Sequence, residues 1–155
     1  MEDDFNQILL NLNSPDPEVR VAAIDLIGQY GALYDDEGQS SSAVPQVSRA
    51  LLTDESRAVR WSAAYALGAI GETAGLASLI EALDRAEADG DIGLQIVILK
   101  ALGKIGGSEA VVALESMLGR AKIACLQVST QRALKWIRTA EAHKANAGKG
   151  PPYEA

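Results

Sequence analysis

Apolar residues recur with helical spacing in four gap-free blocks of thirteen residues. In the block VRWSAAYALGAIG, the first, fifth, ninth and twelfth positions are Val59, Ala63, Leu67 and Ile70. Intervals of four, four and three residues place these side chains on one face of an α-helix. The other blocks are VRVAAIDLIGQYG, LQIVILKALGKIG and LQVSTQRALKWIR, and successive blocks start 40, 35 and 32 residues apart. The pattern predicts one kind of amphipathic helix, repeated four times.

A second apolar stretch precedes each block, as in the run from Val44 to Leu52, so the repeating unit is a helix hairpin. Gly31, Gly71 and Gly106 close the first three blocks, where helices usually end. We expect one domain over residues 1–144, with hairpins at about 3–31, 43–71, 73–106 and 108–142.

Three polar stretches interrupt or close the pattern. Residues 33–43, LYDDEGQSSSA, are acidic and rich in serine, and we expect a mobile loop insertion there. Residues 145–155, ANAGKGPPYEA, have too little apolar content to pack, which predicts a disordered tail. In the last block, Ser129, Thr130 and Gln131 stand where the first and third blocks have Ala22-Ala23-Ile24 and Val97-Ile98-Leu99. The last unit of a stack needs a polar outer face, so we expect these three side chains to face solvent.

The block VRWSAAYALGAIG resembles the inner-helix signature of HEAT-like repeats, particularly the short bacterial type that is also found in phycobilin lyases. The resemblance covers residues 4–138, and the fourth block departs from it by lacking the Val-Arg pair and the closing glycine. It implies an all-α fold, an α-solenoid of four HEAT-like helix hairpins, in which the second helices line a concave side.

Composition excludes most catalytic and metal chemistry. A chain with one His and one Cys cannot form an internal disulfide, a two-His site or a multi-Cys zinc site. We expect Cys125 to be a half-buried packing residue and His143 to be solvated near a helix end. The acidic N-terminus and the lack of a membrane-length apolar run predict a cytoplasmic protein with no membrane partner. We therefore expect no enzyme activity and no cofactor.

Charge is distributed unevenly along the chain. Residues 1–91 carry five Arg and 17 Asp or Glu, a net charge of −12, whereas residues 92–155 have a net charge of +5. In a solenoid, sequence order is spatial order, so one end is acidic and the other basic. This asymmetry favours weak head-to-tail self-association, and the overall charge of −7 disfavours nucleic acid as a partner.

The third, seventh and eleventh positions of the blocks lie opposite the core face. They are Val21, Asp25 and Gln29; Trp61, Tyr65 and Ala69; Ile96, Lys100 and Lys104; and Val128, Arg132 and Trp136. Aromatic and Arg side chains often dominate the energy of protein interfaces. The candidate partner-binding residues are Trp61, Tyr65, Ile96, Lys100, Lys104, Arg132 and Trp136.

Two readings of this stripe remain open. In the first, this row of side chains binds another protein with an acidic or amphipathic segment, and the chain is an adaptor, assembly factor or inhibitor. In the second, the indoles of Trp61 and Trp136 are wedged between helices as structural side chains. The resemblance alone implies a further alternative, a bilin-lyase-like subunit or a tetrapyrrole chaperone.

Overall fold

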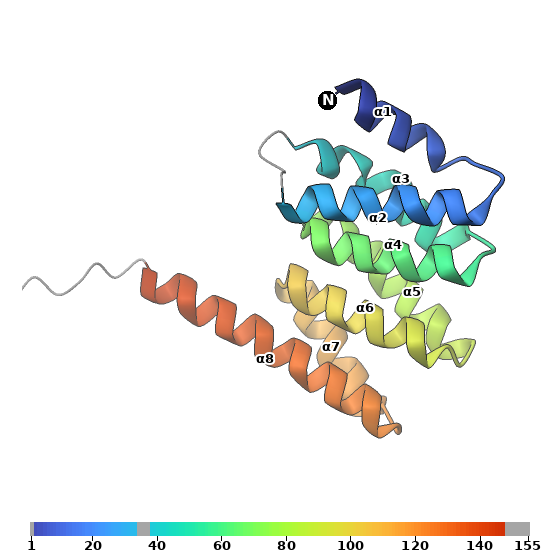
Figure 1. Ribbon diagram of the computed structural model, residues 1–155. Helices are drawn as coiled ribbons and strands as arrows, with labels where there is room; N and C mark the ends of the chain where they lie inside the picture. Colours follow the sequence, from blue (N-terminus) through green and yellow to red (C-terminus); the bar gives the residue numbers. More distant parts are fainter. Residues whose placement is uncertain (1, 34–37, 148–155) are drawn as a thin grey trace, which may run out of the picture.

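The computed structural model describes residues 2–33 and 38–147, and within them it contains eight α-helices and no strand (Figure 1). The helices are α1 (Glu2–Asn11), α2 (Pro17–Leu33), α3 (Gln39–Thr53), α4 (Arg57–Ile70), α5 (Leu76–Ala88), α6 (Ile92–Ile105), α7 (Ser108–Arg120) and α8 (Ala124–Ala147), with a 3-10 turn, η2 (Thr73–Gly75), before α5. The predicted all-α solenoid of stacked hairpins is confirmed.

The helices form two layers. The second helices of the hairpins, α2, α4, α6 and α8, lie side by side in chain order, and α3, α5 and α7 lie behind them (Figure 1). The periodic apolar positions supply the core between the layers, where Ala63, Leu67 and Ile98 are almost fully buried. Val19, at the first position of the first block, departs from this pattern and is exposed.

Small residues allow the second helices of adjacent hairpins to pack with their backbones in contact. A Cβ atom placed on Gly68 of α4 would lie 2.8 Å from the Cα atom of Ala101 on α6. The same arrangement, glycine at the tenth block position against alanine at the eighth position of the next block, occurs at three crossings: Gly28 with Ala66, Gly68 with Ala101, and Gly103 with Ala133. No larger side chain fits at these crossings without moving the helices apart.

Arginine–aspartate pairs join adjacent hairpins. Arg20 donates two hydrogen bonds to the Asp54 carboxylate, at 2.8 and 2.9 Å, and Arg57 does the same to Asp91. Burial raises the pKa of Asp54, but hydrogen bonds from Arg20 and from the Ser56 N–H outweigh it, so this pKa lies below its usual value. Asp54 is therefore held as a carboxylate between two units.

Three expected segment boundaries are wrong. The expected loop insertion at 33–43 is mostly helical, because α2 continues to Leu33 and α3 begins at Gln39; residues 34–37 lie outside the described residues. Gly31 does not end its helix: it has no positive φ, α2 continues through it to Leu33, and it lies against Ile70, whereas Gly71 and Gly106 end their helices at positive φ as predicted. The first three residues of the expected tail belong to α8, and residues 148–155 lie outside the described residues.

Thr130 does not face solvent as expected. It occupies the fifth position of its block, which is a core position in the other blocks, and it is fully buried. Its hydroxyl donates a 2.7 Å hydrogen bond to the Leu126 carbonyl, which satisfies the polar group within its own helix. Gln131 is exposed as expected, and Ser129 is half-buried.

Candidate binding groove

A groove of about 450 Å³ opens on the face of α4, α6 and α8 that lies opposite the layer of α3, α5 and α7. Six of the seven predicted binding residues line it: Trp61, Tyr65, Lys100, Lys104, Arg132 and Trp136. Ile96 does not, because it is half-buried and packs against the core. The other lining residues are Gly68, Val97, Ala101, Ser129 and Ala133.

The floor of the groove is made by the small residues of the helix crossings. Gly68 and Ala101 meet where α4 crosses α6, and Ala133 of α8 meets Gly103 of α6. Because these residues have little or no side chain, the surface is hollowed between the larger side chains on both sides. The requirement for close helix packing thus also creates the groove.

Aromatic side chains form its walls. Trp61 and Tyr65, one turn apart on α4, are stacked with ring centroids 5.9 Å apart and planes inclined by 3°. Trp136 projects from α8. The exposed fractions are 45% for Trp61, 51% for Tyr65 and 52% for Trp136. Indoles wedged between helices would be almost fully buried, so the structural explanation of these tryptophans does not fit the observed exposure.

Three cations surround the aromatic walls. The ammonium group of Lys104 lies 5.2 Å from the centre of the Tyr65 ring, within the range of a cation–π interaction. Lys100 lies one turn before Lys104 on α6, and Arg132 lies on α8; both are exposed. Among residues 2–33 and 38–147, no acidic side chain lines the groove. Its surface is therefore cationic as well as aromatic, although the chain as a whole is acidic.

The groove cations differ from most of the arginines elsewhere, although Arg49 and Arg138 are also without a side-chain partner among the described residues. Within residues 2–33 and 38–147, Lys100 and Arg132 have no hydrogen-bond or ion-pair partner. By contrast, hydrogen bonds to carboxylates or carbonyls engage the guanidinium groups of Arg20, Arg57, Arg60, Arg85 and Arg120. Like charges one turn apart on a helix cost about 0.2–0.5 kcal/mol. The charge of Lys100, which lies beside that of Lys104 and has no partner, therefore does not serve the stability of the free protein.

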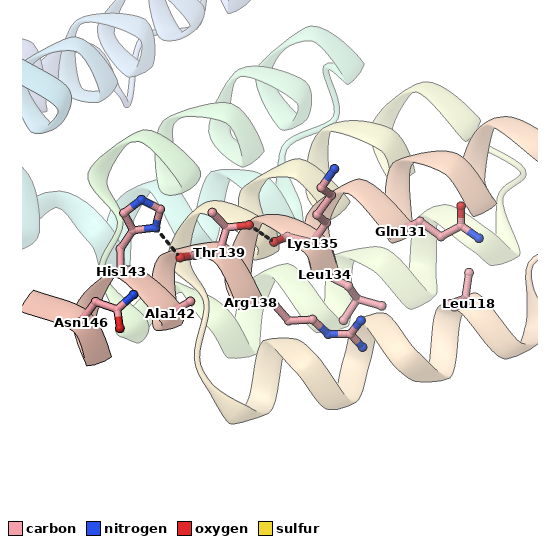
Figure 2. A pocket seen from close by; sticks show the side chains of 9 residues that line it. All are labelled: Leu118, Gln131, Leu134, Lys135, Arg138, Thr139, Ala142, His143 and Asn146. Atoms are coloured by element: carbon pink, nitrogen blue, oxygen red, sulfur yellow. Dashed lines mark hydrogen bonds between the residues drawn. The ribbon is translucent and has the colours of Figure 1, made fainter.

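A second cavity, of about 590 Å³, lies along the C-terminal half of α8 and is shown in Figure 2. Leu118 and Leu134 give it an apolar part, and His143 lies near its far end. The Nδ1 atom of His143 is 2.8 Å from the Thr139 carbonyl, to which it donates, and the Thr139 hydroxyl donates to the Lys135 carbonyl. The polar groups of Thr139 and His143 are thus used within their own helix, and His143 is exposed as predicted.

The remaining candidate chemistry is absent from the described part of the chain. Cys125 is exposed, which corrects the expectation of a half-buried packing residue, because the first turn of α8 extends beyond the core. No group of three or more His, Cys, Asp or Glu side chains in residues 2–33 and 38–147 could hold a metal ion. Over the same residues, no helix has the length and apolar character that crossing a membrane requires.

Sequence reasoning missed the floor of the groove. Gly68, Ala101 and Ala133 were not among the candidates, because small residues carry no chemistry of their own. The signal that could have found them is the recurrence of glycine at the tenth block position and alanine at the eighth. The contact between Lys104 and Tyr65 joins two different blocks, and block spacing alone does not predict it.

Comparison with known proteins identifies the repeat. A family model described as HEAT repeats matches residues 5–90. No curated protein matches the chain. The fold is similar to a crystal structure of an engineered protein, with a TM-score of 0.65 and 23% sequence identity; the match covers 87% of this chain and 62% of that one.

Proposed function

Because the chain belongs to the HEAT-repeat family, we propose that it is a non-enzymatic interaction module that binds a partner protein in the groove lined by Trp61, Tyr65, Lys100, Lys104, Arg132 and Trp136. HEAT repeats generally mediate protein–protein interaction. In the cell such a module acts as an adaptor, an assembly factor or an inhibitor of its partner.

The observation that carries this proposal is the coincidence of half-exposed aromatic walls with unpaired cations around one hollow. Exposed indole and phenol rings leave apolar area in contact with water, and covering that area favours association. Lys100 and Arg132 have charges available for a ligand. Both features are explained if a partner occupies the groove.

Charge complementarity indicates the chemistry of that partner. Since three cations and, among the described residues, no acidic side chain line the groove, an occupant with carboxylates is favoured over a basic one. The aromatic walls additionally favour a large apolar side chain next to those carboxylates. We therefore propose an acidic, amphipathic segment of another protein as the occupant.

The test compares the wild type with a triple variant, Trp61→Ala, Tyr65→Ala and Trp136→Ala. Partners captured from the source cell by the wild type are identified by mass spectrometry, and their affinities for the wild type, the triple variant and the three single variants are then measured with purified components. At least one of the three single substitutions should cost about 2 kcal/mol or more, which is roughly a thirtyfold loss of affinity.

A matched control is Val112→Ala, which removes an exposed apolar side chain from α7 in the other layer. Circular dichroism checks that every variant keeps its helical signal. Unchanged affinity in the triple variant would exclude the groove as the binding site. Visible absorbance after mixing with an open-chain tetrapyrrole tests the bilin-related alternative, which is supported only by the resemblance of the repeats.

A further inference from the structure

The charge of the open face changes sign along the array. The seventh position of each block lies on this face, and in chain order it holds Asp25, Tyr65, Lys100 and Arg132, all of which are exposed. The row therefore has an acidic end on α2, an aromatic centre on α4 and a cationic end on α6 and α8. The groove covers only the aromatic and cationic parts of this row.

Asp25 is held next to the aromatic wall. The hydroxyl of Ser62, the residue after Trp61, donates a hydrogen bond to Oδ1 of Asp25. Ser62 is itself almost fully buried, so it fixes the carboxylate of α2 against the turn of α4 that bears Trp61. Among the described residues, no Lys or Arg pairs with Asp25. Other aspartates of the array do pair with arginines: Asp54, Asp84 and Asp91.

Building on the proposed function, we infer that the segment bound in the groove is bipolar. It places a cationic side chain beside Asp25, a large apolar side chain between the aromatic walls, and carboxylates beside Lys100 and Arg132. Asp25, Lys100 and Arg132, which have no oppositely charged partner among the described residues, then each have one in the complex. The bound segment is oriented along the array, because the reverse orientation brings like charges together at both ends.

The spacing of the helices sets the spacing of these charges. Helices in contact lie about 8–10 Å apart, so Asp25 on α2 and Lys100 on α6 are separated by about 16–20 Å, and Arg132 lies one helix further. An extended peptide advances about 3.3 Å per residue. The cation of the bound segment therefore precedes or follows the first carboxylate by about five or six residues and the second by about eight or nine.

The test uses synthetic peptides and the fluorescence of the two tryptophans of the chain, which both line the groove. The bipolar peptide is blocked at both ends, with lysine first, phenylalanine fourth, glutamate seventh and tenth, and glycine or serine elsewhere. A second peptide has glutamine in place of the lysine, both are also made with the sequence reversed, and the direction that binds more tightly is the one compared below. Titrations are carried out with the wild type, with Asp25→Asn and with the matched control Glu115→Gln, which removes an exposed carboxylate from α7.

The wild type should bind the bipolar peptide about two- to fivefold more tightly than the glutamine peptide, as is typical of one exposed ion pair, and this difference should shrink at high salt. Asp25→Asn should abolish the preference without weakening the glutamine peptide, and Glu115→Gln should retain it. Equal affinity of the wild type for both peptides would overturn the bipolar inference but leave the groove as a binding site. A failure of both peptides to bind would overturn the inference together with the acidic segment as occupant.

Discussion

Gly68→Ala tests whether backbone contact between α4 and α6 determines the geometry of the array. The added Cβ atom would lie 2.8 Å from Cα and 2.9 Å from Cβ of Ala101, whereas carbon atoms in favourable contact are about 3.5–4.0 Å apart. Both atoms belong to or adjoin the backbone of α6, so the helices must separate. Overpacking of this kind costs about 1–3 kcal/mol, and the better helix propensity of alanine returns at most about 1 kcal/mol.

We therefore expect the free energy of unfolding to fall by about 1–3 kcal/mol relative to a Gly→Ala change that gains the same helix propensity without overpacking, and by about 1 kcal/mol less relative to the wild type. For a domain of this size, each kcal/mol lowers the melting temperature by about 2–4 °C. The assay is thermal unfolding followed by far-ultraviolet circular dichroism. Because Gly68 is also part of the groove floor, the tryptophan fluorescence of the folded variant should differ from that of the wild type.

Gly119→Ala is the matched control. Gly119 lies near the end of α7, is exposed, and would carry a Cβ atom with nothing within 4 Å. The same chemical change there should leave the melting temperature unchanged or raise it, because alanine restricts the unfolded chain. A graded series extends the test, since the equivalent contact of Gly28 is longer, at 3.1 Å, and Gly28→Ala should cost less. If Gly68→Ala proved as stable as Gly119→Ala, the backbone contact would not limit the packing.

Two further predictions concern the joints and the end of the array. Because the pKa of Asp54 is lowered in the folded state, the ionised carboxylate stabilises the fold fully above the usual Asp pKa of about 4. This stabilisation is lost as the pH falls through the lower pKa of the folded state. Asp54→Asn should therefore melt at a lower temperature than the wild type at pH 7, with a smaller difference at pH 3. At the open edge of α8, Lys135 occupies the tenth block position, where the other blocks have glycine. Lys135→Gly combined with Gln131→Ala should therefore increase self-association in sedimentation experiments. The control Lys144→Gly, on the exposed end of α8, should not. A double variant that stays monomeric would contradict the idea that Lys135 keeps a second copy from packing against this edge.

Local periodicity was enough to predict the helices and the side of each helix that faces the core. Ala63, Leu67 and Ile70 share one face because helix geometry alone sets their spacing. The same geometry places Trp61 and Tyr65 on the opposite face, and both are exposed. Thr130 shows the strength of this rule, since its position in the block predicts burial although its polar character had indicated exposure. Helix ends were less predictable, because Gly31 packs against a neighbouring unit instead of ending α2.

By itself, then, the sequence determined an array of amphipathic helix hairpins and a row of candidate side chains on one face, because both follow from the period of the α-helix. Only the tertiary structure decided which of those side chains meet. Six of seven converge on one groove, Ile96 turns toward the core, and Lys104 reaches Tyr65 of the preceding unit. These outcomes depend on how closely and at what angle adjacent helices cross, and that is determined by contacts such as Gly68 with Ala101, between residues far apart in the chain.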